Sequence, residues 1–405
     1  MALLPLNDAL AQILSTAPAP PKVESLSIFN GLGRVLGASV VNPRDVPPFD
    51  NSAMDGYAVR AAELPATLRV SQRIPAGAPA APLEPGTVAR VFTGAVIPPG
   101  ADAVVMQEDV SVPPGEAIEV TFGQPATVGQ HIRRRGSDIM AGLTVLEPGR
   151  VLQPQDLALL AATGAPRVEV YRRLRVAIFS TGDELVPPGK VPEDWQIFNS
   201  NSVQLATQIQ ALGCEPILLE TQGDNPTEIG AALRHAATVA DCIVTSGGVS
   251  VGEEDHVRAQ IEQHGELTLW KLAIKPGKPV AYGHVQGCPI FGLPGNPVST
   301  WVTFGLVVKP WLLAAQGAVV PKHRRLACRA DFERPVPGSR EEYLRVVMSG
   351  GGKLAALAGD QSSGVLSSVG RADGLAIIPP GQTLRVGDPV DVVLITEFLS
   401  PNAAG

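Results

Sequence analysis

Aromatic side chains are scarce in this sequence, since Phe, Trp and Tyr together make up 4% of 405 residues. Proteins that bind single-stranded nucleic acid stack its bases on aromatic rings, so this composition argues against that class. A basic excess is also missing, because the formal net charge is −7. We therefore expect neither nucleic acid nor an anionic membrane as the main partner. An anionic ligand would have to be met by local positive charge or by a bound cation.

Cysteines are few and far apart, and no C-x-x-C pair occurs among Cys214, Cys242, Cys288 and Cys328. This spacing argues against a zinc ribbon and against a dense disulfide framework. We expect buried, reduced thiols and a cytoplasmic protein. The first residues, "MALLPLNDALAQIL", lack the basic stretch of a signal peptide and predict a short amphipathic helix instead.

Long uninterrupted hydrophobic runs are also missing. The longest apolar tract, residues 301–320, is interrupted by Lys309-Pro310, so we interpret it as a buried helix and not as a membrane span. The chain is too long for one ordinary core, and two to four domains are expected.

The pattern of apolar runs changes along the chain. Residues 23–41 predict a helix that carries glycines, whereas residues 42–140 hold short runs between Pro/Gly turns and predict a β-rich domain. Residues 151–164 predict a helix. From about residue 168, strands alternate with helices of 10–15 residues, which indicates a parallel sheet covered on both faces. Residues 321–405 return to short strands and predict a small β-barrel or sandwich.

Two predicted strands end in similar loops. In "VAIFSTGDEL" (176–185) and "DCIVTSGGVSVGEEDH" (241–256), an apolar run is followed by glycines and then by acids. Ligands of open α/β sheets bind at the carboxyl ends of strands. Glycines there, namely Gly182, Gly247, Gly248 and Gly252, let backbone N–H groups approach a phosphate. The sequence therefore predicts a phosphate-bearing ligand at this edge.

Three acids would converge on the same edge: Glu184, Asp224 and Asp255. Carboxylates repel phosphate unless a hard divalent cation lies between them, and Mg²⁺ prefers oxygen ligands. Each acid alone would also suit an ordinary position at a helix N-terminus. The combination of three acids with glycine-rich loops favours a metal site.

Two further motifs suit an oxyanion. "KLAIKPGKPVAYG" (271–283) places Lys271, Lys275 and Lys278 around a Pro-Gly turn, although a solvated turn would look the same. "GLPGNPVST" (292–300) opens a helix whose N-terminus could face an anion, and it is not a Walker A loop. In the β-rich region, Arg133–Arg135 could form a salt-bridged surface strand or hold a phosphate.

A hydrolase is an alternative, because "GVSVG" (248–252) matches the G-x-S-x-G nucleophile elbow around Ser250. However, Ser250 lies several residues beyond the strand end, and the acids that follow it would destabilise an oxyanion.

Five segments together resemble the molybdopterin molybdenumtransferases, the MoeA family that includes the gephyrin E domain: "FDNSAMDGYAVR", "FSTGDEL", "SGGVSVGEED", "KLAIKPGKP" and "GLPGNPVS". The resemblance implies a multidomain α/β and β protein with a three-layer, mostly parallel central domain. It divides the chain into a linker domain (22–41 plus 141–167), a β-rich domain (42–140), an α/β molybdopterin-binding domain (1–21 plus 168–320) and a C-terminal β-barrel domain (321–405). It also implies a homodimer whose active cleft takes residues from both subunits.

The implied reaction is the insertion of molybdate into adenylylated molybdopterin, with Mg²⁺-dependent release of AMP. By motif, the catalytic positions would be Asp55, Thr93, Glu184, Asp224 and Asp255, the last three also holding Mg²⁺. The implied substrate-binding positions are Arg133, Asp138, Ser180, Thr181, Gly182, Ser246, Gly247, Gly248, Ser250, Lys271, Lys275, Lys278, Pro294, Pro297, Ser299, Arg345 and Ser363.

Two alternative functions, both found among relatives of this family, remain compatible with the sequence. A molybdopterin adenylyltransferase, which would catalyse the preceding step and hand over its product, shares the α/β domain but would not need residues 42–140 or 321–405. A non-catalytic scaffold of the gephyrin type is the other. The lack of an attached second enzymatic domain favours the plain enzyme.

Overall fold

A computed structural model describes residues 3–112, 118–248, 256–320 and 322–401 of the chain. It separates into two compact units. The first unit consists of Met1–Ala38, Pro148–Pro154 and Arg167–Gly405. The second consists of Ser39–Glu147 and Gln155–Pro166.

The first unit is built around a mixed sheet with the strand order β16-β13-β17-β21-β20-β18. Its strands are β13 (Arg175–Ser180), β16 (Glu215–Leu218), β17 (Cys242–Ser246), β18 (Gly265–Lys271), β20 (Pro279–Val285) and β21 (Cys288–Leu293). The pairs β16/β13, β13/β17 and β17/β21 are parallel, whereas β20 and β18 join antiparallel. The prediction of a mostly parallel sheet is confirmed.

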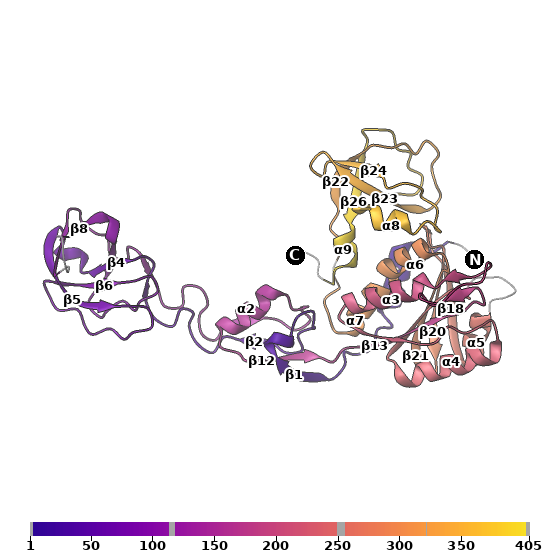
Figure 1. Ribbon diagram of the computed structural model, residues 1–405, viewed down its shortest axis with the longest axis horizontal. Coiled ribbons are helices and arrows are strands. Elements are labelled where there is room, and N and C mark those ends of the chain that lie inside the picture. Colours follow the sequence, from indigo (N-terminus) through magenta and orange to yellow (C-terminus); the bar gives the residue numbers. More distant parts are fainter. Residues whose placement is uncertain (1–2, 113–117, 249–255, 321, 402–405) are drawn as a thin grey trace. The chain divides into compact units, whose positions relative to one another are not determined.

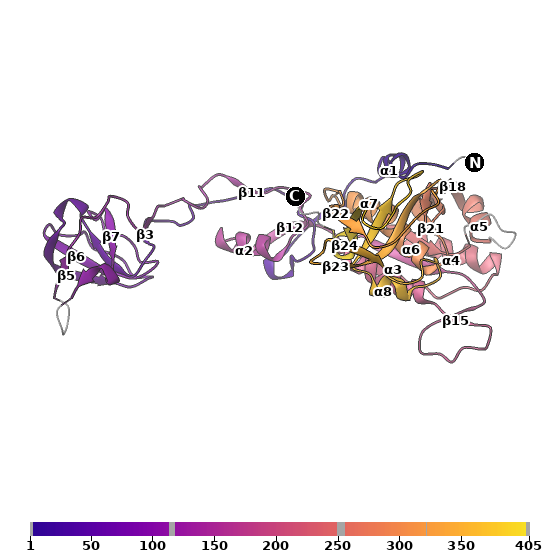
Figure 2. The ribbon, with the colours of Figure 1, turned by 90° about the horizontal axis from the view of Figure 1, so that it is seen from above.

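Helices cover both faces of this sheet, as Figure 1 shows. In β13, Val176 and Ile178 face one apolar cluster, and the alternate residues Ala177 and Phe179 face another. The first cluster includes residues of α1 (Leu6–Leu14), α3 (Ser200–Ala211), α6 (Pro297–Thr303) and α7 (Lys309–Ala315). The second includes residues of α4 (Pro226–Val239) and α5 (His256–His264). This is the predicted three-layer arrangement, and in Figure 2 α1 lies beside α7.

One helix runs from Pro297 to Ala315 without a break, through α6, the π-helical turn η4 (Phe304–Val308) and α7. Lys309-Pro310 interrupts the apolar run but not the helix, and the prediction of a buried helix is confirmed. Pro310 lacks an N–H donor, and the wider π-turn just before it lets the helix continue. The helix is long and apolar enough to cross a membrane, but 94% of its most apolar 18-residue stretch is buried inside the first unit. It is a core helix.

The C-terminal part of the first unit is a closed β-barrel. Its strands are β22 (Leu326–Ala330), β23 (Glu341–Ser349), β24 (Leu354–Leu357), β25 (Gly374–Ile378) and β26 (Pro389–Leu394). Each pairs with two neighbours, and the parallel pair β22/β24 completes the ring. The short strand β19 (Ile274–Lys275) adds to β23, and two helices complete this part: α8 (Ser367–Arg371) and α9 (Ile395–Leu399). Of the two predicted alternatives, the barrel is the one that forms.

The helix predicted for residues 23–41 does not form. This segment holds β1 (Val23–Ser27), the 3-10 turn η1 (Ile28–Asn30) and β2 (Val40–Val41). β1 pairs antiparallel with β12 (Arg167–Tyr171), so that Val23 lies opposite Tyr171. The backbone hydrogen bonds of β1 thus go to a strand far away in the sequence, and this tertiary pairing overrides the local pattern.

The second unit is β-rich, as predicted. Its main sheet has the order β7-β4-β6-β5-β9-β8. The strands are β4 (Gly56–Val59), β5 (Ala66–Ile74), β6 (Thr87–Val91), β7 (Ala103–Met106), β8 (Val110–Ser111) and β9 (Glu119–Phe122). Two short pairs, β2 with β11 (Thr144–Leu146) and β3 (Asn51–Ser52) with β10 (Ile132–Arg133), accompany it, with the turns η2 (Ala61–Glu63) and η3 (Gln107–Asp109). The predicted helix in residues 151–164 forms as α2 (Pro154–Ala162).

The four cysteines are buried free thiols, as the sequence predicts. Burial raises the pKa of the Cys214 thiol to about 12 and that of Cys288 to about 11. Neither sulfur is a nucleophile near neutral pH, because the thiolate is the reactive form.

Candidate active site

The two glycine loops lie side by side because their strands are neighbours in the sheet. Ser180 at the end of β13 is in register with Ser246 at the end of β17, and Ser246 is in register with Leu293 at the end of β21. The N–H of Gly247 donates to the carbonyl of Leu293 over 3.0 Å. The loops after three parallel strands therefore meet at one edge, where ligands of such sheets bind.

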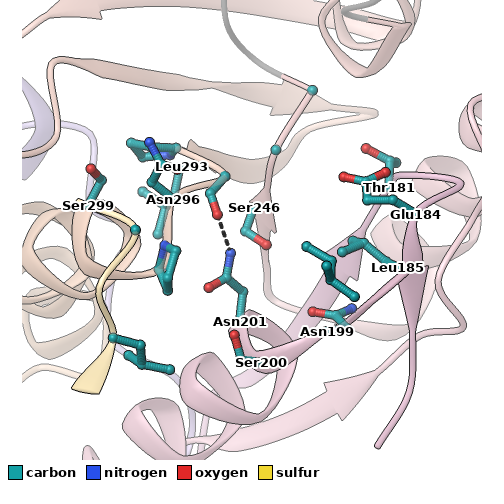
Figure 3. A pocket seen from close by; sticks show the side chains of 18 of the residues that line it. Thr181, Glu184, Leu185, Asn199, Ser200, Asn201, Ser246, Leu293, Asn296 and Ser299 are labelled. Carbon is teal, nitrogen blue, oxygen red and sulfur yellow. Dashed lines mark hydrogen bonds between the residues drawn. The ribbon is translucent and has the colours of Figure 1, made fainter. Parts of the chain in front are cut away.

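A cavity of about 790 Å³ opens at this edge (Figure 3). Its lining includes eight of the predicted site residues: Thr181, Glu184, Ser246, Gly247, Gly248, Pro294, Pro297 and Ser299. The other predicted residues that the structure describes in this unit do not line it: Ser180, Gly182, Asp224, Lys271, Lys275, Lys278, Arg345 and Ser363. Ser250 and Asp255 lie outside the described residues. The cavity is large enough for a drug-sized ligand.

The backbone of the second loop requires glycine. Gly247 and Gly248 have φ values of +87° and +65°, in the left-handed region that other residues adopt at a cost. A Cβ atom on Gly248 would also lie 2.5 Å from Cγ2 of Val257 in α5. These glycines thus bring a bare backbone to the wall of the cavity.

The first loop links Glu184 to the segment that carries Asp224. The N–H of Gln222 donates to the carbonyl of Ser180, and the N–H of Gly182 donates to the carbonyl of Gln222. Asp183 adds a bond, since its Oδ1 accepts from the N–H of Asp224 over 3.2 Å. Glu184 and Asp224 are both exposed, and neither forms an ion pair with another described residue.

The two described carboxylates of this site, Glu184 and Asp224, are suitable ligands for a hard divalent cation. Two exposed carboxylates without a cationic partner stand on linked loops, and oxygen ligands of this kind are those that Mg²⁺ prefers. Among the described residues, no three His, Cys, Asp or Glu side chains group closely enough to hold a metal ion. Asp255, the third predicted ligand, is outside that part of the chain.

The start of α3 contributes Asn199, Ser200 and Asn201 to the cavity, and none of the three is among the site residues predicted from the sequence. Asn199 caps this helix, because its Oδ1 accepts from the N–H of Ser202 over 3.0 Å. Asn201 donates from Nδ2 to the carbonyl of Gly295 over 2.7 Å, the dashed line in Figure 3, so α3 is fastened to the loop after β21. Asn and Ser at the start of a helical period are a capping signal, and a helix start that follows a strand-end loop could have pointed to these three residues.

Apolar residues of two short strands, β14 (Leu185–Val186) and β15 (Ile197–Phe198), complete this side of the cavity. β14 and β15 pair in parallel, and Leu185 lies opposite Ile197. Phe198, which lines the cavity, is 49% exposed. The cavity therefore combines polar loops with an apolar wall, which suits a ligand that has both a charged group and a ring system.

The barrel also reaches the cavity, through Gly364 and Leu366. Ser363 lies just before them and holds this loop against α6. Its Oγ accepts from Nδ2 of Asn296 over 3.1 Å, and its carbonyl accepts from the N–H of Val298 over 3.1 Å. Ser363 therefore acts on the cavity through its neighbours.

Arg345 is 1% exposed and fixes the same loop from within the barrel. Its Nε donates to Oγ of Ser368, and its Nη2 donates to the carbonyls of Asp360 and Ser362. Burial lowers the pKa of this guanidinium, which nevertheless stays charged because the ordinary pKa of Arg is so high. Arg345 thus positions the loop of Ser363 and Gly364.

The three predicted lysines differ in their environment. Lys275 pairs with Oε1 of Glu342 over 3.2 Å, and Arg334 bonds to the other oxygen of that carboxylate. Lys271 and Lys278 have no ion pair with any described residue. Lys278 is exposed and precedes Pro279, which lines the cavity. Two of the three charges are thus free to meet an anion.

In the second unit, Asp55 and Thr93 contact each other. Oδ1 of Asp55 accepts from the backbone N–H of Thr93 over 2.7 Å and from its Oγ1 over 2.8 Å. These two hydrogen bonds lower the pKa of the Asp55 carboxyl, so it is ionised at neutral pH.

Of the three consecutive arginines in this unit, Arg134 pairs with Asp50 over 2.6 Å and Arg135 with Asp45 over 2.5 Å. The salt-bridged alternative is therefore right for these two. Arg133 is exposed and has no ion pair among the described residues. Asp138 is exposed, and its backbone N–H donates to the carbonyl of Val46 over 3.0 Å.

The fold and the cavity define a class: a multidomain α/β protein that binds its ligand at the carboxyl edge of a mixed sheet. Three family models match the chain. They are described as MoeA N-terminal region (domain I and II), over residues 4–164, probable molybdopterin binding domain, over residues 177–314, and MoeA C-terminal region (domain IV), over residues 328–395. The chain belongs to the MoeA family, and the resemblance noted in its sequence is confirmed.

Named relatives agree with this assignment. The chain is 43% identical over 318 residues to a molybdopterin molybdenumtransferase of Haemophilus influenzae, covering 78% of each chain. It is 37% identical over 388 residues to one of Nostoc sp., covering 92% of this chain and 88% of the relative. A crystal structure of a molybdopterin biosynthesis MoeA protein from Pyrococcus horikoshii OT3 superposes with a TM-score of 0.83 at 30% identity, over 97% of this chain and all of that one.

Proposed function

We propose that this chain is a molybdenumtransferase of molybdenum cofactor biosynthesis, which inserts molybdate into adenylylated molybdopterin and releases AMP. The observation that carries the proposal is the cavity, where the carboxylate of Glu184 faces the same space as two glycine-rich loops. A ligand with phosphates and a ring system suits this lining. The membership of the whole chain in the MoeA family supports the same reaction.

The loops would hold the substrate through its phosphates. Gly247 and Gly248 present a backbone without side chains, and the first turn of α3 at Ser200 opens into the same cavity. N–H groups at a helix start carry partial positive charge and bind phosphate oxygens. Phe198 and Leu185 would contact the ring system from the apolar side.

Mg²⁺ is proposed as the cofactor, held by Glu184, Asp224 and Asp255. When bound, it would offset the repulsion between these carboxylates and the substrate phosphates. The support is chemical: Glu184 lines the cavity, and Asp224 stands on a loop bonded to the same strand end.

Molybdate would be met by positive charge near the cavity. Lys271 and Lys278 have no ion pair among the described residues, and Lys278 adjoins the cavity wall at Pro279. Ser299 lines the cavity directly, whereas Arg345 and Ser363 would act by placing the barrel loop. A lysine ammonium is a compact partner for an oxyanion.

A homodimer is proposed as the working state. Exposed apolar side chains on β1, η1 and the turn after it support it: Phe29 is 90% exposed, Leu32 55% and Val23 45%. Apolar groups of this size in contact with water favour association. Analytical ultracentrifugation would test it, with a Phe29→Asp variant expected to shift the protein towards the monomer.

The cytoplasm is the proposed location, and the four buried free thiols agree with a reducing compartment. Handover of substrate from the adenylyltransferase of the preceding step is a further proposal. Cross-linking of the two purified proteins would support it, and the lack of any complex at micromolar concentrations would contradict it.

The reaction is tested with purified protein, adenylylated molybdopterin, molybdate and Mg²⁺, by measuring AMP release alongside active cofactor. The proposal requires that release depends on both molybdate and Mg²⁺. Formation of adenylylated molybdopterin from ATP would assign the chain to the preceding step instead. A folded protein that does neither would favour the scaffold.

A further inference from the structure

Two arginines of the second unit face each other on adjacent strands. β5 and β6 run in parallel in the sheet, and Arg73 is the register partner of Arg90 (Figure 1). Like charges that are directly opposite on neighbouring strands destabilise a sheet. This arrangement therefore needs a compensating group, either in the protein or in a ligand.

An aromatic ring supplies part of that compensation. The guanidinium carbons of Arg73 and of Arg90 each lie 4.7 Å from the ring centroid of Phe92, and that of Arg90 also lies 5.1 Å from the ring of Tyr57. The negative face of an aromatic ring attracts a cation, and arginine is the usual partner. Both guanidinium groups are thus held against the same ring, Phe92, which does not neutralise either of them.

Close ion pairs do not supply the rest, although the Asp55 carboxylate lies near enough to Arg90 for this guanidinium to contribute to the lowering of its pKa. Neither Arg73 nor Arg90 forms an ion pair with any residue that the structure describes. Other arginines of the same unit do, since Arg60 pairs with Glu63 over 3.5 Å and Arg69 with Glu84 over 3.7 Å. Arg73 and Arg90 thus stand opposite each other without an ion pair that would neutralise either of them.

One of the two is held rigidly and the other is free. Arg90 donates from Nη1 to the carbonyl of Gly56 over 2.9 Å and from Nη2 to Oε1 of Gln107 over 2.5 Å. Arg73 is exposed, and it has no hydrogen bond to another described residue. A fixed and a free guanidinium can bind one anion together. Arg90 is already ordered by its hydrogen bonds, so the entropic cost of binding comes mainly from ordering the side chain of Arg73.

The pair adjoins the predicted functional residues of this unit. Gly56, which Arg90 contacts, follows Asp55, and Phe92 precedes Thr93. Asp55 and Thr93 bond to each other, so the turn after β6 is fastened beside the arginines.

We propose that Arg73 and Arg90 form an anion-binding subsite of the second unit, which takes a phosphate group of a small-molecule ligand. Guanidinium groups bind phosphate through paired hydrogen bonds, whereas they bind a neutral ligand poorly. That this phosphate belongs to the adenylylated substrate rests on the proposed function; the subsite itself rests on the arginine pair.

Arg73→Gln is the most informative variant, because Arg73 has no hydrogen bond or ion pair with a described residue to lose, only its contact with the Phe92 ring. Arg69→Gln is the matched control: it removes the same charge from an exposed position of the same strand, where the side chain is 58% exposed. Binding of inorganic pyrophosphate to the full chain is measured by calorimetry. Arg73→Gln should weaken it about tenfold or more, as the loss of a charged hydrogen bond does, and Arg69→Gln less than twofold.

A second measurement locates the binding, since pyrophosphate also suits the cavity of the first unit. An arginine-specific dicarbonyl reagent is applied with and without pyrophosphate, and the modified residues are identified by peptide mass spectrometry. Protection of Arg73 but not of Arg69 supports the subsite. Equal modification of Arg73 with and without millimolar pyrophosphate overturns it.

The two proposals fail separately. If the wild-type chain transfers molybdenum, but Arg73→Gln leaves the KM for the adenylylated substrate unchanged and pyrophosphate does not protect Arg73, the subsite is wrong and the proposed function stands. If pyrophosphate protects Arg73 but no molybdenum is transferred, the subsite stands and the proposed function falls.

Discussion

Asn296 and Ser363, 67 positions apart in the chain, are joined by a hydrogen bond of 3.1 Å from Nδ2 to Oγ. Asn296 directly precedes α6, and Ser363 belongs to the barrel loop whose next residue, Gly364, lines the cavity. The barrel is therefore more than an appended domain: it supplies one wall of the candidate active site and is fastened there by this bond.

Removal of this bond should affect the site more than the stability. A neutral hydrogen bond of this kind contributes about 0.5–1.5 kcal/mol, so we expect Ser363→Ala and Asn296→Ala to unfold at nearly the same urea concentration as the wild type. The KM for molybdate should rise several-fold in both. Their double variant should show little further effect, because both changes break one contact. Full additivity, or an equal effect of Ser367→Ala at the exposed first residue of α8, would contradict this role.

Arg345 should matter for stability as well as for the site. Arg345→Met removes the donors to Ser368, Asp360 and Ser362, and leaves one buried and two partly buried acceptors without this partner. We expect a loss of about 3 kcal/mol in the free energy of unfolding, measured with urea. Arg371→Met is the control at an exposed position of α8, and its change should stay within about 0.5 kcal/mol.

Phe398 fastens the C-terminal helix α9 to the α/β part. Its ring stacks 4.8 Å from that of Trp301, and it fills the space beside Gly305, where a Cβ atom would lie 2.1 Å from Cε1 of Phe398. Phe398→Ala should therefore cost about 3–5 kcal/mol of stability in urea unfolding. Gly305→Ala should also destabilise the fold, by overpacking the same contact. A loss below 1 kcal/mol for Phe398→Ala would refute this packing role.

His323 should make the fold sensitive to acid. Burial, with the nearby charge of Lys309, lowers the pKa of His323 from 6.5 to about 4. Between these two pH values the unfolded chain binds a proton that the folded chain does not, so stability falls as the pH drops below 6.5. The loss by pH 4 should reach at most roughly 3 kcal/mol. His323→Gln should flatten the profile of unfolding free energy over this range, and an unchanged slope would contradict the assignment.

The structural features that follow a regular local pattern of apolar residues could be predicted from the sequence. The strands and helices of residues 168–320 alternate strongly, so the parallel sheet and its strand-end loops followed from the pattern, and with them Glu184 and Gly247. The glycines were informative because only a residue without Cβ fits there.

The errors have a common physical cause, which is pairing or packing over a long distance. β1 was predicted as helix because its partner β12 is not visible in a local window. Asn201 was missed because its contact with Gly295 depends on how α3 packs. The roles of Arg345 and Ser363 as loop-positioning residues likewise needed the barrel to be closed first.

The most direct test of the central claim is the rate of molybdate-dependent AMP release in Glu184→Gln compared with Glu193→Gln. Both changes remove one carboxylate charge from exposed positions of neighbouring segments, but only the first lies on the cavity. Our account predicts at least a hundredfold loss for Glu184→Gln, about 2.7 kcal/mol of barrier, with unchanged unfolding, and near wild-type activity for Glu193→Gln. Equal rates for Glu184→Gln and the wild type would show that the chemistry takes place elsewhere.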